Sequence, residues 1–365
     1  MKADSVAQLI MTGVPGKKLE PETARLFRRV QPGAYILFGR NIESATQLRR
    51  LIDDLRDLSD IEPIITIDQE GGRVSRLRLI GNEPPDAQQL RDKNDIDLIR
   101  RHGDITGRLL RLFGFNLDLC PVLDISFDDD SENSLRGRCY GKTVEQVVRN
   151  AGAFNEAMRV QGIASCGKHF PGYSAATSDA HYQLPRIDRT REELDQNELA
   201  VFRQFVPDVD SMMICHAWYP CFESQPTPAT VSRRIVTELL RNEFGFDGLV
   251  MTDDLDMGAI LTGYRLDDTI RLCLAAGNDI MMLCHRVPEI ETVHQILGTL
   301  PSDQIERAQH HIANFKKNLS PPQKFSESAF QEINAKIADL RTAVVGEEEA
   351  GRVVTERQIS PVERF

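Results

Sequence analysis

The stretch SRRIVTELLRNEFGFDGLVMTDD, residues 232–254, joins a helix-length amphipathic segment to a short apolar run that ends in two carboxylates. A continuous apolar run of this length is typical of a strand buried on both faces, as the strands of parallel sheets are. A second helical pattern, DDTIRLCLAAG, follows at residues 267–277. The stretch therefore predicts one step of a βα rhythm in which polar residues stand directly after the strand.

The same rhythm recurs along the whole chain. Apolar runs stand at residues 6–13, 34–39, 63–68, 115–124, 162–167, 211–216, 248–253 and 279–284, and helix-length amphipathic segments separate them. Eight such strands alternating with helices predict an α/β protein built as a (β/α)8 TIM barrel. A doubly wound sheet is the rival architecture, but no G-x-G-x-x-G follows the first run.

The length of the chain suits one barrel with an extension. The chain has 365 residues, whereas a barrel of this kind typically uses about 250. We expect residues 1–319 to form a single barrel domain that carries the catalytic site. Residues 320–365 open with SPPQ, continue with one helical pattern and end in a polar stretch. This composition predicts a C-terminal helix and a loosely ordered tail rather than a second domain.

Charge and composition argue against several classes of partner. The net charge of −11 and the pI near 5.3 disfavour nucleic acid and anionic membrane surfaces. No apolar run approaches the roughly 18 residues of a membrane span, and the first residues lack the apolar core of a secretory signal. Cysteines at 120, 166, 215 and 284 lie in apolar runs without C-x-x-C spacing, so we expect buried, reduced thiols. These features predict a cytoplasmic protein that acts on a small ligand and leave the oligomeric state open.

Polar side chains gather where the predicted strands end. The set comprises Arg40, Asn41, Asp68, Gln69, Glu70, Asp124, Lys168, His169, His216, Asp253, Asp254 and His285. Catalytic groups of (β/α)8 barrels lie at the carboxyl ends of the strands. Charged groups are costly to desolvate, so their convergence at one mouth calls for partners or a ligand. The pattern predicts an active site at this end of the barrel.

Two adjacent carboxylates stand at the end of the seventh run, and their arrangement suggests a type of reaction. Asp253 and Asp254 are adjacent, so in a strand their side chains point to different sides and only one easily faces the pocket. One pocket-facing carboxylate together with one proton donor is the minimum for retaining glycoside hydrolysis. Asp254 and His216 are expected to be structural supports.

The donor candidate lies in the loop after the fifth run. Asp179 and His181 are two residues apart, which in an extended segment places both side chains on one face. A hydrogen-bonded Asp fixes the tautomer of a His and stabilises its charged form. A metal site built from His169, Asp179 and His181 is the rival, but no H-E-x-x-H or comparable spacing supports it. We expect neither a metal nor a cofactor. The adjacent His310 and His311 are expected to be solvated.

Several motifs, taken in order, resemble glycoside hydrolase family 3. They are YILFGRN (35–41), TIDQEGGRVSRL (66–77), KHFPG (168–172) with DAH (179–181), and MTDDLDMGA (251–259) after FGFDGLV. The sequence is most similar to the single-domain β-N-acetylglucosaminidases, or β-hexosaminidases, of bacterial cell-wall recycling. The resemblance runs from about residue 9 to residue 284. It implies hydrolysis of terminal β-linked N-acetylglucosamine, plausibly on peptidoglycan fragments, by double displacement.

The resemblance also implies roles for individual positions. Asp253 matches the nucleophile, His181 the acid/base, and Asp179 its partner on a mobile loop. The sugar-binding positions of the family correspond to Asp68, Arg76, Arg138, Lys168 and His169. Asp124 is a weaker match and is expected to be structural. The expected partner is a small carbohydrate, with neither nucleic acid nor membrane.

The chain departs from the family pattern in the catalytic loop. Relatives commonly read KHFPGHG, whereas Tyr173 and Ser174 follow Gly172 here. Ala180 and Asp256 each stand where relatives have Ser. These departures bear on aglycone preference more than on the chemistry. Three alternatives remain: a β-N-acetylglucosaminide phosphorylase, a β-glucosidase of the same family, and a non-catalytic sugar-binding barrel.

Overall fold

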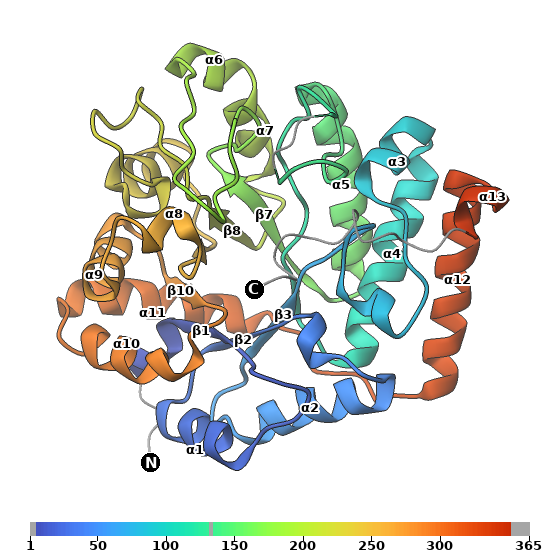
Figure 1. Cartoon of the computed structure of the whole chain (residues 1–365), viewed down its shortest axis with the longest axis horizontal. Helices are drawn as coiled ribbons and strands as arrows, with labels where there is room; N and C mark the ends of the chain where they lie inside the picture. The colour runs from blue at the N-terminus through green and yellow to red at the C-terminus, as the bar shows by residue number, and fades with distance from the viewer. Residues whose placement is uncertain (1–4, 131–133, 352–365) are drawn as a thin grey trace.

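The chain folds into a closed parallel barrel surrounded by helices (Figure 1). The computed structural model describes residues 5–130 and 134–351. Neighbouring strands are parallel in the ring order β1-β10-β9-β8-β7-β6-β3-β2. The strands are β1 (Ile10–Gly13), β2 (Ala34–Leu37), β3 (Ile64–Ile67), β6 (Leu117–Asp118), β7 (Ala164–Phe170), β8 (Ser211–Ile214), β9 (Leu249–Asp254) and β10 (Ile280–Leu283). Each lies within or overlaps one predicted run, so the predicted (β/α)8 barrel is confirmed.

Two of the runs are only partly strand. Residues 5–9 form the 3-10 helix η1 (Ser5–Leu9), which packs against α11 (Ser302–Lys317), the second α-helix after the last strand. The fourth run spans ten residues, yet β6 covers only Leu117–Asp118. Pro121 has no backbone N–H to offer the ladder, and beyond it one isolated bridge joins Val122 to Lys168. The end of this run therefore acts as a loop that delivers Asp124.

Helices cover the outer surface of the barrel, and several begin at side-chain caps. Ser44, for example, accepts a hydrogen bond from the backbone N–H of Gln47 at 3.2 Å. The helices between the strands are α1 (Pro21–Val30), α2 (Ala45–Asp57), α3 (Ala87–Lys93), α4 (Ile96–Phe113), α5 (Val144–Val160), α6 (Arg191–Gln196), α7 (Glu198–Phe205), the π-helix η5 (Arg234–Glu243), α8 (Gly258–Leu261) and α9 (Leu266–Ala276). After β10 follow α10 (Ile290–Leu297), α11, α12 (Glu327–Val345) and α13 (Glu347–Ala350).

The long connection after β3 carries a hairpin that the sequence did not predict. Strands β4 (Gln69–Gly71) and β5 (Val74–Ser75) pair antiparallel. The turn between them places Gly71 and Gly72 at φ of 116° and 51°, a region that residues with a Cβ rarely adopt. This hairpin turns the chain back over the barrel mouth.

The C-terminal extension contains one long helix that packs on the barrel. Helix α12 lies beside α4 at the edge of the molecule (Figure 1), and Phe330 meets Phe113 with ring centroids 5.4 Å apart. Arg341 donates a hydrogen bond to Glu83, in the connection that follows the hairpin, at 2.9 Å. The expected loose tail falls largely on residues 352–365, which lie outside the described part of the chain. Within the described ranges, no helix combines the length and apolar character needed to cross a bilayer.

Candidate active site

Side chains from seven barrel strands and the loops that follow them line one pocket at the barrel mouth. Seven of the eight residues predicted for the site are among its lining residues: Asp68, Arg76, Arg138, Lys168, His169, His181 and Asp253. The eighth, Asp179, is not among the lining residues but is hydrogen bonded to His181. The barrel geometry therefore brings together positions that span residues 68–253 of the chain.

Asp253 lies at the end of β9 with its carboxylate half-buried. One carboxylate oxygen accepts a hydrogen bond from the backbone N–H of Asp254 at 2.8 Å. Burial opposes its negative charge, but the fields of His216, His169 and His181 outweigh burial and hold the pKa of Asp253 below its ordinary value. Asp253 is thus ionised at neutral pH and available as a nucleophile or electrostatic stabiliser.

The neighbouring carboxylate has a different environment. Asp254 accepts backbone hydrogen bonds from Asp256 and Cys284 at 3.0 and 3.2 Å. Burial and the nearby carboxylates of Asp256 and Asp253 raise the pKa of Asp254 to about 7. His216 supports the same strand end, because its Nε2 lies 2.9 Å from the carbonyl of Asp254. These contacts fit a supporting role for both residues.

Asp179 and His181 form a hydrogen-bonded pair in the loop after β7. The Nδ1 atom of His181 lies 2.6 Å from Asp179 Oδ1, which also accepts the backbone N–H of His181 at 2.9 Å. A carboxylate can only accept, so Nδ1 carries the hydrogen and Nε2 is left for proton transfer. Hydrogen bonding to His181 keeps the pKa of Asp179 below its usual value although burial opposes this.

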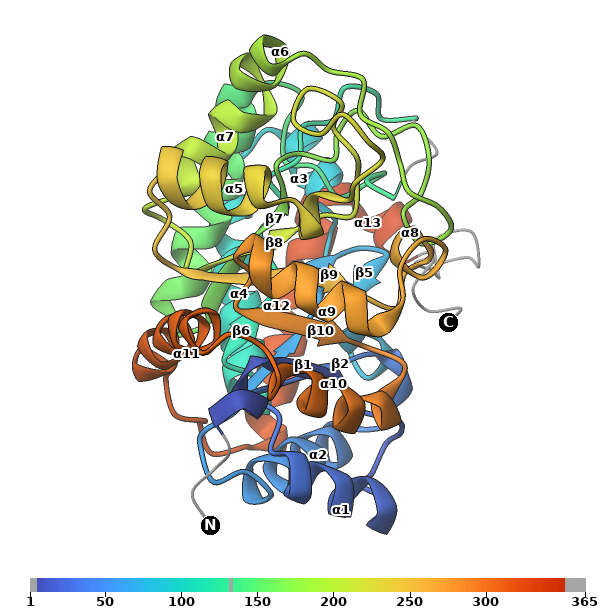
Figure 2. The same ribbon diagram turned by 90° about the vertical axis from the view of Figure 1, so that its left-hand side faces the viewer.

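The loop that carries Asp179 and His181 is tied to the segment that follows β9. The carbonyls of Ala180 and His181 accept hydrogen bonds, each 3.0 Å, from the backbone N–H groups of Ala259 and Gly258. Those N–H groups belong to the start of α8, which lies beside the loop in Figure 2. Backbone pairing therefore links the loop that carries His181 to the strand end that carries Asp253.

A network of charged side chains forms one wall of the pocket. Lys168 Nζ lies 2.8 Å from Asp68 Oδ1 and 2.6 Å from Glu70 Oε1. Both oxygens of Glu70 are also bound by Arg138, at 2.7 Å each. Burial would raise the pKa of Glu70, but Arg138 and Lys168 hold it well below its usual range. Arg76 completes the wall with a contact of 3.7 Å to Asp68.

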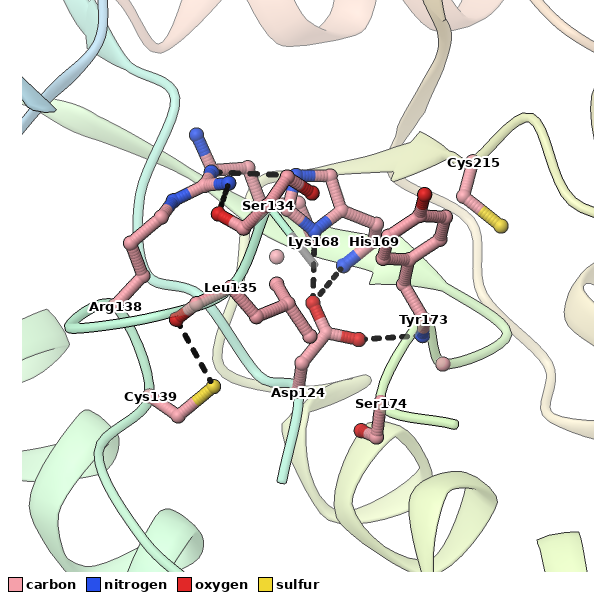
Figure 3. Close-up of polar contacts among 12 residues, drawn as sticks. Asp124, Ser134, Leu135, Arg138, Cys139, Lys168, His169, Tyr173, Ser174 and Cys215 are labelled. Atoms are coloured by element: carbon pink, nitrogen blue, oxygen red, sulfur yellow. Dashed lines mark hydrogen bonds and ion pairs between the residues drawn. The ribbon is translucent and has the colours of Figure 1, made fainter. Parts of the chain in front are cut away.

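His169 is oriented by Asp124 (Figure 3). Asp124 Oδ2 lies 2.7 Å from His169 Nδ1 and accepts the backbone N–H of His169 at 3.1 Å. The carboxylate thus fixes Nδ1–H, and the Nε2 atom of His169 faces Arg138 at 3.4 Å. Asp124, expected to be structural, orients a residue predicted to bind sugar.

Sequence reasoning missed the importance of Glu70 and Arg73. Glu70 was only one of many polar strand-end residues, yet it is the common partner of Arg138 and Lys168. Arg73 lines the pocket, and burial next to Arg138 lowers its pKa to about 10. The available signal was the spacing in DQEGGRVSR, where Glu70 and Arg73 flank the glycines of the hairpin turn.

A larger groove of about 1190 Å³ lies elsewhere, between α5, α11 and the amino-terminal ends of β7 and β9. Its charged residues include the ion pair of Arg159 with Asp210, at 2.8 Å. This groove does not contain the strand-end residues that converge on the smaller pocket, so the smaller pocket is the better candidate for catalysis.

Comparison with known proteins shows what this chain is similar to. The sequence pattern of the glycosyl hydrolase family 3 N-terminal domain matches residues 2–315. A β-hexosaminidase of Pseudomonas aeruginosa is 34% identical over 303 residues, which cover 82% of this chain and 90% of that protein. A β-hexosaminidase of Vibrio cholerae is 32% identical over 300 residues, covering 81% and 87%.

Solved structures agree with these relatives. The structure of a glycoside hydrolase family 3 β-N-acetylglucosaminidase from Paenibacillus sp. superposes with a TM-score of 0.87 at 29% identity. The superposition covers 94% of this chain and 69% of that chain. The likeness therefore extends over nearly the whole of this chain.

Proposed function

The chain belongs to glycoside hydrolase family 3, and from this membership we propose that it is a retaining exo-β-N-acetylglucosaminidase. Its substrate is a terminal β-linked N-acetylglucosamine. The observation that carries the proposal is the pairing of an ionised Asp253 with His181, whose Nε2 is left available by Asp179, at one pocket. Similarity to β-hexosaminidases over most of the chain supports the sugar class.

In the first displacement, a carboxylate oxygen of Asp253 attacks the anomeric carbon and forms a covalent bond to it. The bond from that carbon to the leaving oxygen breaks. The proton on His181 Nε2 moves to the leaving oxygen. Before this transfer the imidazole is positively charged, and the hydrogen bond that its Nδ1–H donates to Asp179 stabilises that charge.

In the second displacement, His181 Nε2 takes a proton from water, whose oxygen attacks the same carbon. The bond to Asp253 breaks, which regenerates the carboxylate and releases the sugar with its original configuration. The same imidazole serves as acid and then base, so its orientation matters in both steps.

The sugar itself is proposed to bind on the charged wall. The cations Lys168, Arg138 and Arg76 face the carboxylates of Asp68 and Glu70, so this wall presents fixed hydrogen-bond donors and acceptors. Such an arrangement suits the hydroxyl groups of a sugar. We assign sugar-hydroxyl contacts to Asp68, Arg76, Arg138, Lys168 and His169.

The source of the substrate and the cellular compartment are also part of the proposal. We propose fragments of peptidoglycan as the source of the terminal sugar, and seven free cysteines are consistent with a reducing compartment. We therefore propose a cytoplasmic enzyme whose partner is a small carbohydrate.

Replacing the nucleophile tests the proposal directly. Asp253→Ala should lower turnover of an aryl β-N-acetylglucosaminide by roughly 10⁴-fold or more, because no covalent intermediate can form. The measurement is release of the aryl group, run in parallel with the matched β-glucoside. Asp247→Ala, whose carboxylate is 95% exposed, is the control and should keep wild-type activity. If Asp253→Ala kept full turnover, the assignment of Asp253 as the nucleophile would be wrong. If the wild type preferred the β-glucoside, the assignment of N-acetylglucosamine as the substrate sugar would be wrong.

The acid role of His181 has its own signature. His181→Ala should lower kcat/KM by roughly 10²- to 10⁴-fold for substrates with poor leaving groups. Activated leaving groups need little protonation, so their kcat/KM should fall far less. The measurement is kcat/KM against the pKa of the leaving group. An equal fall for both classes contradicts the acid assignment.

Phosphorolysis is a second candidate, favoured by one observation. The donor is an imidazole rather than a carboxylate, and a neutral or cationic donor repels phosphate less. Addition of inorganic phosphate to the assay separates the two activities. Free N-acetylglucosamine as the product at all phosphate concentrations supports the hydrolase, whereas glycosyl phosphate supports the phosphorylase.

A further inference from the structure

The loop that carries the acid/base pair is anchored at its root by Tyr173 and Ser174. The backbone N–H of Tyr173 donates to Asp124 Oδ1 at 2.6 Å, while Asp124 Oδ2 holds His169 (Figure 3). The hydroxyl of Ser174 accepts the backbone N–H of Ile125 at 2.8 Å. One buried carboxylate therefore serves both the sugar-binding histidine and the root of the loop.

The hydroxyl of Tyr173 joins the start of this loop to the backbone on both sides of Asp179. It donates to the carbonyl of Ser178 at 2.9 Å and accepts the backbone N–H of Ala180, also at 2.9 Å. These two contacts bracket Asp179 on either side. The Tyr173 ring is buried and packs 6.2 Å from the His169 ring, so the hydroxyl is held in place.

The contacts that hold the Asp179–His181 segment, which we call the clamp, also include hydrogen bonds to α8. Ala180 donates its N–H to Tyr173 and offers its carbonyl to Ala259, while the carbonyl of His181 accepts the N–H of Gly258. The backbone from Asp179 to His181 is thus fixed at one end by the Tyr173 hydroxyl and at the other by α8. A short chain fixed at both ends leaves the His181 ring little freedom beyond its side-chain torsions.

We propose that Tyr173 is a positioning residue that holds the Asp179–His181 pair in the geometry for proton transfer. The proposal rests on the proposed glycosidase function and adds the means by which its proton donor is oriented. Both Tyr173 and Ser174 anchor the loop through their hydroxyl groups. Tyr173 touches no reacting atom in this scheme and acts through the loop backbone.

Tyr173→Phe removes only the hydroxyl and keeps the buried ring. We expect kcat/KM to fall roughly tenfold for substrates with poor leaving groups, because a displaced imidazole transfers its proton less efficiently. Strongly activated aryl substrates should keep kcat/KM within about twofold, because their departure needs little protonation. KM should change less than kcat for the poor leaving groups, since the sugar-binding wall is left intact.

The matched control is Tyr35→Phe, which removes a buried tyrosine hydroxyl from β2, outside the lining of the pocket. It should leave the dependence on leaving group unchanged. Tyr173→His, which retains a polar group in a shorter side chain, should resemble Tyr173→Phe and replaces it if the Phe variant does not fold. A uniform fall across all leaving groups, or no fall at all, overturns the proposal.

A second readout does not depend on activity. Amide hydrogen exchange of a peptide covering residues 174–184 should become faster in Tyr173→Phe, because Ala180 N–H loses its acceptor. Unchanged exchange in this peptide overturns the clamp even if the enzyme is active. If folded wild-type protein cleaves no glycoside, the proposed function fails, while faster exchange still supports the clamp.

Discussion

At the scale of single residues, the site shows how burial and partners together set the charge of a carboxyl group. Asp253 and Glu70 have pKa values below their ordinary range because histidines or cations outweigh burial. Burial dominates at Asp118, whose pKa rises to about 8 although the backbone N–H of Gln69 and the charge of Lys168 favour its ionised form. Residue type alone therefore does not determine which carboxyl groups are ionised at neutral pH.

Glu198, which does not line the pocket, can be used to test how burial changes the pKa of a carboxyl group. It lies at the start of α7 against Gly172, and among the described residues no other side chain hydrogen bonds to its carboxylate, although the charge of Arg189 favours the ionised form. Burial raises its pKa from 4.5 to about 7. A raised carboxyl pKa means that the folded state prefers the neutral form, so stability falls as the pH rises from about 4.5 to about 7.

Glu198→Gln removes that ionisation. The variant should therefore match the wild type near pH 4.5 and exceed its free energy of unfolding by up to about 3 kcal/mol at pH 8. Urea unfolding at both pH values measures the difference. Glu192→Gln on the exposed face of α6 is the control. Equal stability of wild type and Glu198→Gln at pH 8 would show that Glu198 ionises without penalty in the folded protein.

At the scale of secondary structure, α12 is an integral part of the packed molecule. Its buried residues include Phe330, Ile337, Leu340 and Val344, which face α4 and its neighbours. Leu340→Ala should lower the free energy of unfolding by about 2–5 kcal/mol, because it leaves a cavity at a fully buried site. The measurement is urea unfolding, with the exposed Asp339→Ala as a control expected within about 0.5 kcal/mol. A loss below about 1 kcal/mol for Leu340→Ala would mean that α12 is only loosely attached.

The elements themselves were largely predictable. Each of the eight predicted runs contributes a barrel strand, because buried parallel strands need continuous apolar side chains. The antiparallel hairpin after β3 was not predicted, because its strands are short and polar and its turn depends on the positive φ of two glycines. The division at residue 319 stays a prediction, since nothing here separates the extension from the barrel.

At the scale of the whole molecule, the barrel encloses nearly all of its thiols. Of the seven free cysteines, Cys221 is exposed and the other six are buried, as expected for Cys120, Cys166, Cys215 and Cys284. Burial raises the pKa of these buried thiols and blocks access to them.

A thiol-specific reagent should therefore modify one cysteine in the native protein and seven after denaturation in guanidinium chloride. Mass spectrometry of the labelled peptides should identify Cys221 as the native site. Rapid modification of two or more cysteines without denaturant would show that the closed barrel opens in solution.

The sequence by itself determined the strand count, the polar strand ends and the spacing of Asp179 and His181, because these are local patterns along the chain. Pairings over long distances required the tertiary structure. Glu70 meets Arg138 across 68 positions, and His311, expected to be solvated, pairs with Asp279 at 2.8 Å. Closure of the barrel brings such residues together and removes water from them. Only the folded structure could therefore decide which charges are paired, which carboxyl groups stay neutral, and that the Tyr173 hydroxyl closes the loop carrying Asp179 and His181.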